Sequence, residues 1–117
     1  MLTTEFAKTF AEDWLSAWNS HDLERILSHY SDDFTMSSPY IATIANEPSG
    51  TLQGRNAVAA YWRTALDLMP SLHFELVTTL VGAESLVLYY KGARGMAAET
   101  FFFNASGKVV KAAAHYE

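Results

Sequence analysis

A carboxylate stands alone in one of the most apolar stretches of this sequence. Glu99 lies within residues 96–103, and on the two-residue period of a β-strand it shares a face with Phe101 and Phe103. If that face points into the protein, burial disfavours the charged carboxylate and raises its pKa. Glu99 would then act as a general acid or base, or donate a hydrogen bond while neutral. The alternative is a structural carboxylate that pairs with the Trp14 indole, a tyrosine hydroxyl or a cross-strand arginine.

Aromatic side chains are the second group suited to a site. They make up 14% of the chain, while charged residues make up only 18%, below the roughly 25% of an average soluble domain. This surplus predicts that some aromatic side chains line a cavity or a subunit interface. Tyrosine and tryptophan add a polar tip, which suits an apolar pocket with a few hydrogen-bonding groups. The candidate walls, for each of which core packing is the alternative, are Trp14, Trp18, Tyr30, Tyr40, Tyr61, Trp62, Phe74, Tyr90, Phe101, Phe103 and Tyr116.

The sequence offers little for metal or cofactor chemistry. It has no cysteine, which excludes disulfides and thiolate metal sites, and its four histidines lack the paired spacing of metal ligands. We therefore expect no metal ion and no cofactor. Asp32 and Asp33 are adjacent carboxylates, but their position predicts a solvated turn rather than a catalytic pair. His115 is expected on the outer face of the last strand.

The charge pattern argues against large charged partners. The net charge is −5 and the lysines and arginines are scattered singly, whereas nucleic-acid binding needs a concentrated positive face. No apolar run reaches the ~18 residues of a membrane span, and the first residues lack the charged-then-apolar order of a signal peptide. These features predict a soluble, cytoplasmic protein that binds neither nucleic acid nor membrane.

The elements that position these residues follow from two periodicities. Helical spacing of apolar residues predicts helices at residues 4–19, from Asp22 to Tyr30, and at 56–68. Residues 34–38 alternate as a short strand that Pro39 ends, and residues 40–53 are predicted to be an irregular loop. After Pro70 the period falls to two, which predicts strands at 72–81, 86–91, 96–103 and 108–116. Helices followed by hairpin-linked strands indicate one α+β domain over residues 1–117 with an antiparallel sheet.

Four short motifs frame nearly the whole chain. They are Asn-Ser-His-Asp-Leu at 19–23 with Tyr-Ser-Asp-Asp-Phe at 30–34, Ser38-Pro39, Gly-Arg-Asn-Ala-Val at 54–58, and Phe-Phe-Phe-Asn-Ala-Ser-Gly-Lys-Val-Val at 101–110. In this order they resemble the nuclear transport factor 2-like superfamily, which includes ketosteroid isomerases and SnoaL-like polyketide cyclases. The resemblance implies a cone-shaped, curved antiparallel β-sheet wrapped around three N-terminal helices, with a deep pocket. It also implies a homodimer formed through the outer face of the sheet.

The resemblance allows a comparison with ketosteroid isomerase positions. The general base of that family falls on Ser38, the two tyrosines of its oxyanion hole fall on Trp14 and Trp62, and its partner acid falls on Glu99. A serine hydroxyl without an adjacent base is not basic at neutral pH. Ketosteroid isomerase chemistry is therefore not expected.

Two functions follow from this comparison. The first is a small-molecule-binding domain whose aromatic pocket, with Ser38, holds a small apolar or cyclic ligand. The alternative is a cofactor-free SnoaL-like isomerase, cyclase or dehydratase acting on a small cyclic or polyketide-like substrate. In that enzyme Glu99 would be the acid or base and a tyrosine such as Tyr40 or Tyr61 would assist. A role in protein interaction alone is the third option.

Overall fold

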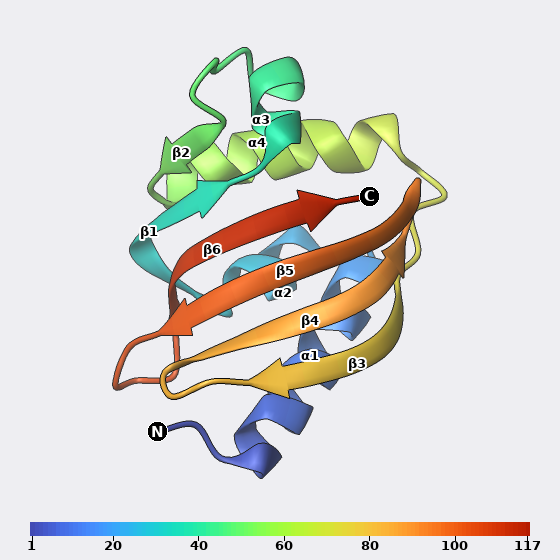
Figure 1. The fold of residues 1–117 in the computed structure, drawn as a ribbon. Coiled ribbons are helices and arrows are strands. Elements are labelled where there is room, and N and C mark those ends of the chain that lie inside the picture. Colours follow the sequence, from blue (N-terminus) through green and yellow to red (C-terminus); the bar gives the residue numbers. More distant parts are fainter.

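A six-stranded curved sheet organises the chain, with the strand order β2-β1-β6-β5-β4-β3 (Figure 1). The computed structural model describes all of residues 1–117. The elements in chain order are α1 (Thr4–Asn19), α2 (Leu23–Leu27), β1 (Tyr30–Ser37), α3 (Pro39–Ile44), β2 (Thr51–Gln53), α4 (Arg55–Leu68), β3 (Glu75–Val81), β4 (Ser85–Gly92), β5 (Gly95–Phe103) and β6 (Val109–Tyr116). No helix has both the length and the apolar character needed to span a membrane.

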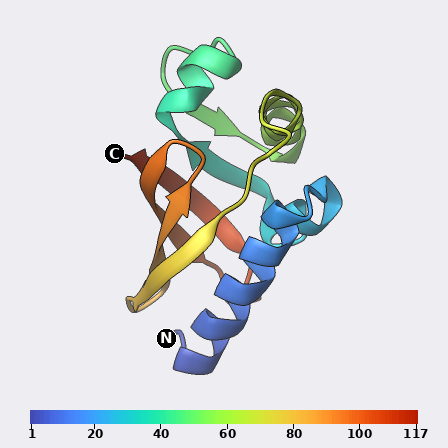
Figure 2. The same ribbon diagram turned by 90° about the vertical axis from the view of Figure 1, so that its right-hand side faces the viewer.

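The helices lie on one face of the sheet. In Figure 1 the strands β3 to β6 face the viewer and α1 and α2 lie behind them, so the opposite face is free of helices. Figure 2 shows α1 against one end of the inner face, while α3 and α4 lie at the other end. This arrangement confirms the predicted α+β fold with a curved sheet around helices.

Local sequence explains why α1 forms and which face it buries. The Thr3 side chain caps the helix by accepting a hydrogen bond from the Phe6 backbone N–H at 3.0 Å. The apolar residues recur every three or four positions, so they form one stripe along the helix. The buried members of this stripe are Ala7, Phe10, Ala11, Trp14, Ala17 and Trp18.

The strand β1 differs from its prediction in two ways. It begins at Tyr30 rather than at Phe34, since α2 ends at Leu27. Tyr30, which was predicted to belong to the helix, therefore belongs to the sheet. It also pairs in parallel with β6, whereas an antiparallel sheet was predicted throughout. The pairing shifts register between Tyr30 and Thr35, which places the expected acidic turn inside an irregular strand.

The stretch predicted as a loop, residues 40–53, contains the helix α3 and the short strand β2. Ser38 caps α3 by accepting a hydrogen bond from the Tyr40 backbone N–H at 3.1 Å, and Pro39 occupies the first helical position. Serine followed by proline is a helix-start signal as well as a strand-stop signal. The prediction of an irregular loop over residues 40–53 took Pro39 only as a strand stop, and it was wrong for this segment.

Alternate residues of the strands point inward and form the core on the inner face of the sheet. Leu88, Glu99 and Ala114 lie side by side across β4, β5 and β6, and all three are buried on the inner face. Their neighbours in sequence point to the outer face, because side chains alternate along a strand. The predicted inward position of Glu99 is thereby confirmed.

Candidate functional site

A cavity opens between the helices and one end of the sheet. It is lined by 20 residues, 15 of them hydrophobic, from α1, α3, α4 and the ends of β4, β5 and β6. The enclosed space measures about 80 Å³. Known small-molecule pockets combine apolar walls with a few polar groups. The cavity therefore has the lining of a ligand site.

The main polar group in the cavity wall is Glu99. Its side chain is only 4% exposed, and its Oε1 accepts a hydrogen bond from the Tyr90 hydroxyl at 3.0 Å. Burial raises the pKa of Glu99 from 4.5 to about 7, although the hydrogen bond from Tyr90 opposes part of this rise. Of the three partners expected for Glu99, the structure shows a tyrosine hydroxyl, that of Tyr90. Near neutral pH this carboxyl can either accept or donate a proton.

Aromatic rings hold the phenol of Tyr90 in place. Its ring centroid lies 4.7 Å from that of Phe74 and 5.4 Å from that of Trp14. Burial and the nearby charge of Glu99 raise the pKa of Tyr90 far above its usual value. Tyr90 is consequently a hydrogen-bond donor at any physiological pH, and it presents that hydrogen to Glu99.

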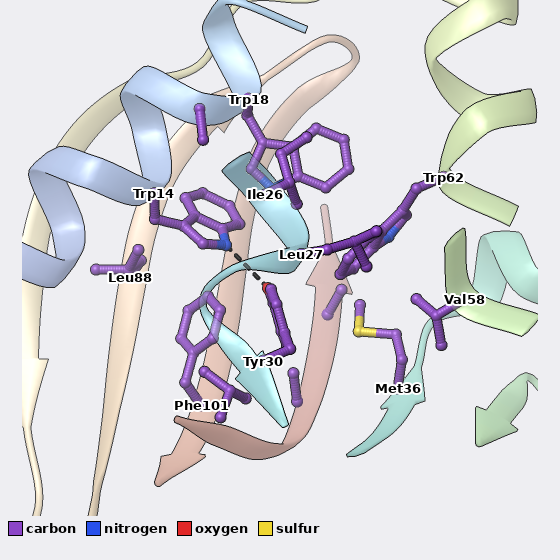
Figure 3. Close-up of a cluster of buried hydrophobic side chains, with 14 of the residues drawn as sticks. Trp14, Trp18, Ile26, Leu27, Tyr30, Met36, Val58, Trp62, Leu88 and Phe101 are labelled. Atoms are coloured by element: carbon purple, nitrogen blue, oxygen red, sulfur yellow. Dashed lines mark hydrogen bonds between the residues drawn. The ribbon is translucent and has the colours of Figure 1, made fainter. Parts of the chain in front are cut away.

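The indole of Trp14 is engaged elsewhere. Its Nε1 donates a hydrogen bond to the Tyr30 hydroxyl at 3.0 Å, drawn as the dashed line in Figure 3. Both residues are about 1% exposed. Trp14 thus contributes a ring face to the cavity wall, while its N–H serves the core behind that wall.

A second polar group lies around Ser38, which is hydrogen-bonded to two of the lining residues, Tyr40 and Tyr61. The Tyr61 hydroxyl donates to Ser38 Oγ at 3.5 Å, and Ser38 Oγ also accepts from the Tyr40 backbone N–H. Burial raises the pKa of Tyr61. Ser38 is itself buried and acts as the cap of α3, so its oxygen already accepts two hydrogen bonds.

The structure separates the predicted site residues into two groups. Those that line the cavity are Trp14, Trp18, Tyr40, Tyr61, Trp62, Phe74, Tyr90, Glu99 and Tyr116. Those outside its lining are Tyr30, Ser38, Phe101 and Phe103.

Tyr30, Phe101 and Phe103 do not line the cavity because they pack elsewhere in the core. Tyr30 packs against Phe34 and Trp62, with ring centroids at 4.5 and 5.1 Å. Phe101 lies between α1 and the sheet, 5.0 Å from the ring of Phe10. Phe103 packs against the same ring at 5.0 Å, near the start of α1. These side chains share the inner face with Glu99, but α1 covers them.

The prediction missed several lining residues. Met36, Ile44, Met69 and Leu72 add aliphatic walls, and the turn between β4 and β5 adds Arg94. The alternation of β1 predicts an inward side chain at Met36. No local signal marks the turn, because its closeness to α3 depends on how far β4 and β5 extend beyond their neighbours.

The histidines lie away from the cavity. His115 is exposed, in agreement with its predicted outer-face position, and His73 is also exposed. His21 Nε2 lies 2.8 Å from the Leu72 carbonyl oxygen. No three His, Asp or Glu side chains gather in a way that could hold a metal ion.

Comparison with known proteins places the chain in a family. A family model described as a SnoaL-like domain matches residues 11–116. A SnoaL-like protein of unknown function from Burkholderia thailandensis superposes with a TM-score of 0.94 at 53% identity, covering 98% of this chain and 97% of that one. A search of curated proteins gave no significant match.

More distant structures share the fold alone. TerC co-crystallised with polyporic acid superposes with a TM-score of 0.76 at 11% identity, over 96% of this chain and 92% of that one. A candidate polyketide cyclase from Sinorhizobium meliloti superposes with a TM-score of 0.75 at 12% identity, over 97% and 100% of the two chains. With the fold, the cavity and the family match together, this chain belongs to the SnoaL-like domain family.

Proposed function

We propose that this protein binds a small cyclic molecule in its aromatic cavity. The observation that carries the proposal is the buried Glu99–Tyr90 pair within an otherwise apolar wall. An apolar wall gives affinity through the hydrophobic effect, and a single polar pair fixes the orientation of a ligand. TerC, a protein of this fold, was co-crystallised with polyporic acid.

The same contacts argue against steroid isomerisation. Ser38, at the position of the family's general base, accepts two hydrogen bonds and has no basic side chain hydrogen-bonded to it. Trp14, at the position of an oxyanion-hole tyrosine, donates its N–H to Tyr30. Neither residue supplies the group that the isomerase reaction requires at that position.

The binding proposal is tested by filling the cavity. Ala65 lines the cavity from α4 and is buried, so Ala65→Phe places a ring in the ligand space. Ala60 is exposed on the same helix, which makes Ala60→Phe the matched control. We expect cyclohexanecarboxamide, followed by tryptophan fluorescence, to bind the native chain and Ala60→Phe but not Ala65→Phe. Equal binding by both variants would overturn the proposal, and Ala65→Leu replaces Ala65→Phe if thermal unfolding shows the latter to be misfolded.

A specific observation favours enzymatic use of the same cavity as a second candidate function. Glu99 has a pKa of about 7 and only one hydrogen-bond partner, so its second carboxyl oxygen is available to a substrate. In this reaction the carboxylate takes a proton from the carbon next to a carbonyl, and the electron pair moves to the carbonyl oxygen. This enolisation is followed by return of a proton to carbon, which restores the carbonyl. Return to the same carbon gives proton exchange, and return to another carbon gives an isomer.

The enzymatic candidate has a direct test. Cyclohexanone in heavy water should exchange the protons next to its carbonyl for deuterium faster with the native protein than in buffer, as followed by NMR. Glu99→Gln should remove the acceleration, because an amide cannot take up the proton. Exchange at the buffer rate with the native protein would leave binding as the function.

We also propose that two copies associate through the outer face of the sheet. This face carries no helix (Figure 1). Leu80, Tyr89 and Phe102, on three adjacent strands, are 60%, 38% and 41% exposed. The same apolar surface on a second copy complements it, since a two-fold interface is self-complementary. Sedimentation should return twice the 13.0 kDa chain mass.

Charged variants test the proposed association. Phe102→Glu should give a monomer, because each copy then buries a carboxylate at the interface. Leu68→Glu is the control, since Leu68 is 63% exposed on α4, away from the sheet. A monomeric native chain at tens of micromolar would refute the association.

A further inference from the structure

The turn between β4 and β5 places a cation at the mouth of the cavity. Arg94 is the only basic residue among those that line the cavity. Its guanidinium lies 5.3 Å from the centroid of the Tyr40 ring, and that ring lies 4.4 Å from the ring of Tyr116. Figure 2 shows this turn, α3 and the end of β6 at the same end of the molecule. Arg94 is therefore held over an aromatic platform beside the entrance.

The guanidinium of Arg94 has no anionic partner in the protein. The chain contains two ion pairs, Met1 with Glu84 and Arg55 with Asp32, and neither includes Arg94. Arg94 also makes no side-chain hydrogen bond within the chain, although a guanidinium offers five donors in a planar fork. An arginine stacked on a ring still presents these donors in the plane of its fork.

The acidic groups nearest to the cavity already have partners. Glu117 Oε1 accepts a hydrogen bond from the Met96 backbone N–H at 2.9 Å. Glu99 Oε1 accepts from Tyr90 on the inner face of the sheet. The fork of Arg94 is thus the free charged donor at the entrance.

The residues that follow Arg94 contact the end of β6. Gly95 has φ of +126°, and a Cβ at this position would lie 2.7 Å from Glu117 Oε1. The Glu117 backbone N–H also donates to the Met96 carbonyl at 3.0 Å. These contacts hold the residues after Arg94 against the end of β6, and they restrict the positions that Arg94 can occupy.

We propose that Arg94 binds the carboxylate of a small cyclic acid whose ring occupies the cavity. This inference rests on the proposed function and adds the chemical class of the ligand. The fork of a guanidinium matches the two oxygens of a carboxylate, and such paired bonds add geometric specificity. The ring then meets the aromatic walls, while the carboxylate stays at the mouth.

The exposure of Arg94 sets the size of the expected effect. The pair forms at a solvent-open entrance, so water and salt weaken it. We therefore expect a gain of about tenfold in affinity for the acid over its neutral amide, the size of a charge-assisted hydrogen bond. High salt should reduce this preference and leave binding of the neutral amide nearly unchanged, because only the charged contact is screened.

The test compares two probes of nearly equal shape. Binding of cyclohexanecarboxylate and cyclohexanecarboxamide is measured by calorimetry with the native chain, Arg94→Gln and Arg63→Gln. Arg63 is an exposed arginine on α4 that does not line the cavity, so it is the matched control for a lost positive charge. We expect the native chain and Arg63→Gln to prefer the acid about tenfold, and Arg94→Gln to bind both probes equally.

The outcomes separate this inference from the proposed function. If the amide binds but the native chain shows no preference for the acid, the cavity is a ligand site and the role of Arg94 is refuted. A preference that survives in Arg94→Gln also refutes that role. If neither probe binds to any of the three proteins, the proposed function itself fails, and the inference fails with it.

Discussion

The Tyr90 hydroxyl donates a 3.0 Å hydrogen bond to a carboxyl group that is almost completely buried, that of Glu99. The two residues lie on neighbouring strands, β4 and β5, with both side chains on the inner face. A tyrosine and an acid in such contact form a unit whose proton content depends on pH, because burial moves the pKa of Glu99 to about 7.

Stability should depend on this proton. The pKa of Glu99 rises from 4.5 in the unfolded chain to about 7 in the folded one, so between these values the folded state binds more protons. The free energy of unfolding must then fall as pH rises through this range, by about 3 kcal/mol at most.

The pH dependence can be measured by urea denaturation between pH 5 and 8. Glu99→Gln cannot ionise, so its stability should stay flatter than that of the native chain over this range. Native and variant curves that run parallel would show that Glu99 does not titrate there.

Removal of the Tyr90 hydroxyl should move the same transition. Tyr90→Phe deletes the hydrogen bond that lowers the pKa of Glu99, so that pKa should rise above its present value. The lost bond should also cost about 1 kcal/mol of stability at neutral pH. Tyr89→Phe is the control, since Tyr89 is 38% exposed on the outer face. Identical transitions in the two variants would contradict the coupling.

The hydrogen bond between Trp14 and Tyr30 should contribute to stability. Trp14→Phe leaves the Tyr30 hydroxyl buried without its donor and also opens a void, for a combined cost of about 2–4 kcal/mol. Tyr30→Phe removes only the hydroxyl and should cost about 1 kcal/mol. A double-mutant cycle from urea unfolding separates the two contributions. An interaction energy of zero would mean that the bond adds nothing.

The contact between Gly95 and Glu117, at the end of β6, should affect the stability of the fold. Gly95→Ala puts a Cβ against Glu117 and forces a positive φ on alanine, so it should cost about 1–3 kcal/mol. Gly54→Ala is informative as a control, because Gly54 also has a positive φ of +93° but has no atom within 4 Å of the new Cβ. The difference in melting temperature between the two variants therefore measures the contact with Glu117. Equal losses would show that the contact is unimportant.

Much of this site could be predicted from sequence because it follows from periodicity. Residues of α1 at helical spacing and residues of β5 at alternate positions must share a face, so Trp14 and Glu99 were placed inward correctly. The same argument also selected Phe101 and Phe103, which share that face but lie beneath α1. Periodicity identifies a face, whereas the boundary of a cavity on that face depends on where a helix ends.

The remaining features depend on contacts between distant segments. The stacking of Arg94 on Tyr40 joins a hairpin turn to α3, a helix within the segment that the sequence predicts to be a loop. Nothing near Arg94 in the chain indicates this neighbour. The parallel pairing of β1 with β6 is hidden for the same reason, since neither strand carries a mark of its partner.

Because of this parallel pairing, β6 connects the two portions of the sheet. The hairpin-linked strands β3, β4 and β5 form one portion, β1 and β2 form the other, and β6 alone bridges them. During synthesis, β1 must wait for residues 109–116 before it can gain its second neighbour. Assembly of the sheet is therefore a late event that depends on a contact between distant parts of the chain, the kind of contact that slows folding. The strand that completes the sheet is also the strand whose end, at Tyr116, lines the cavity, so the cavity is complete only when the sheet is.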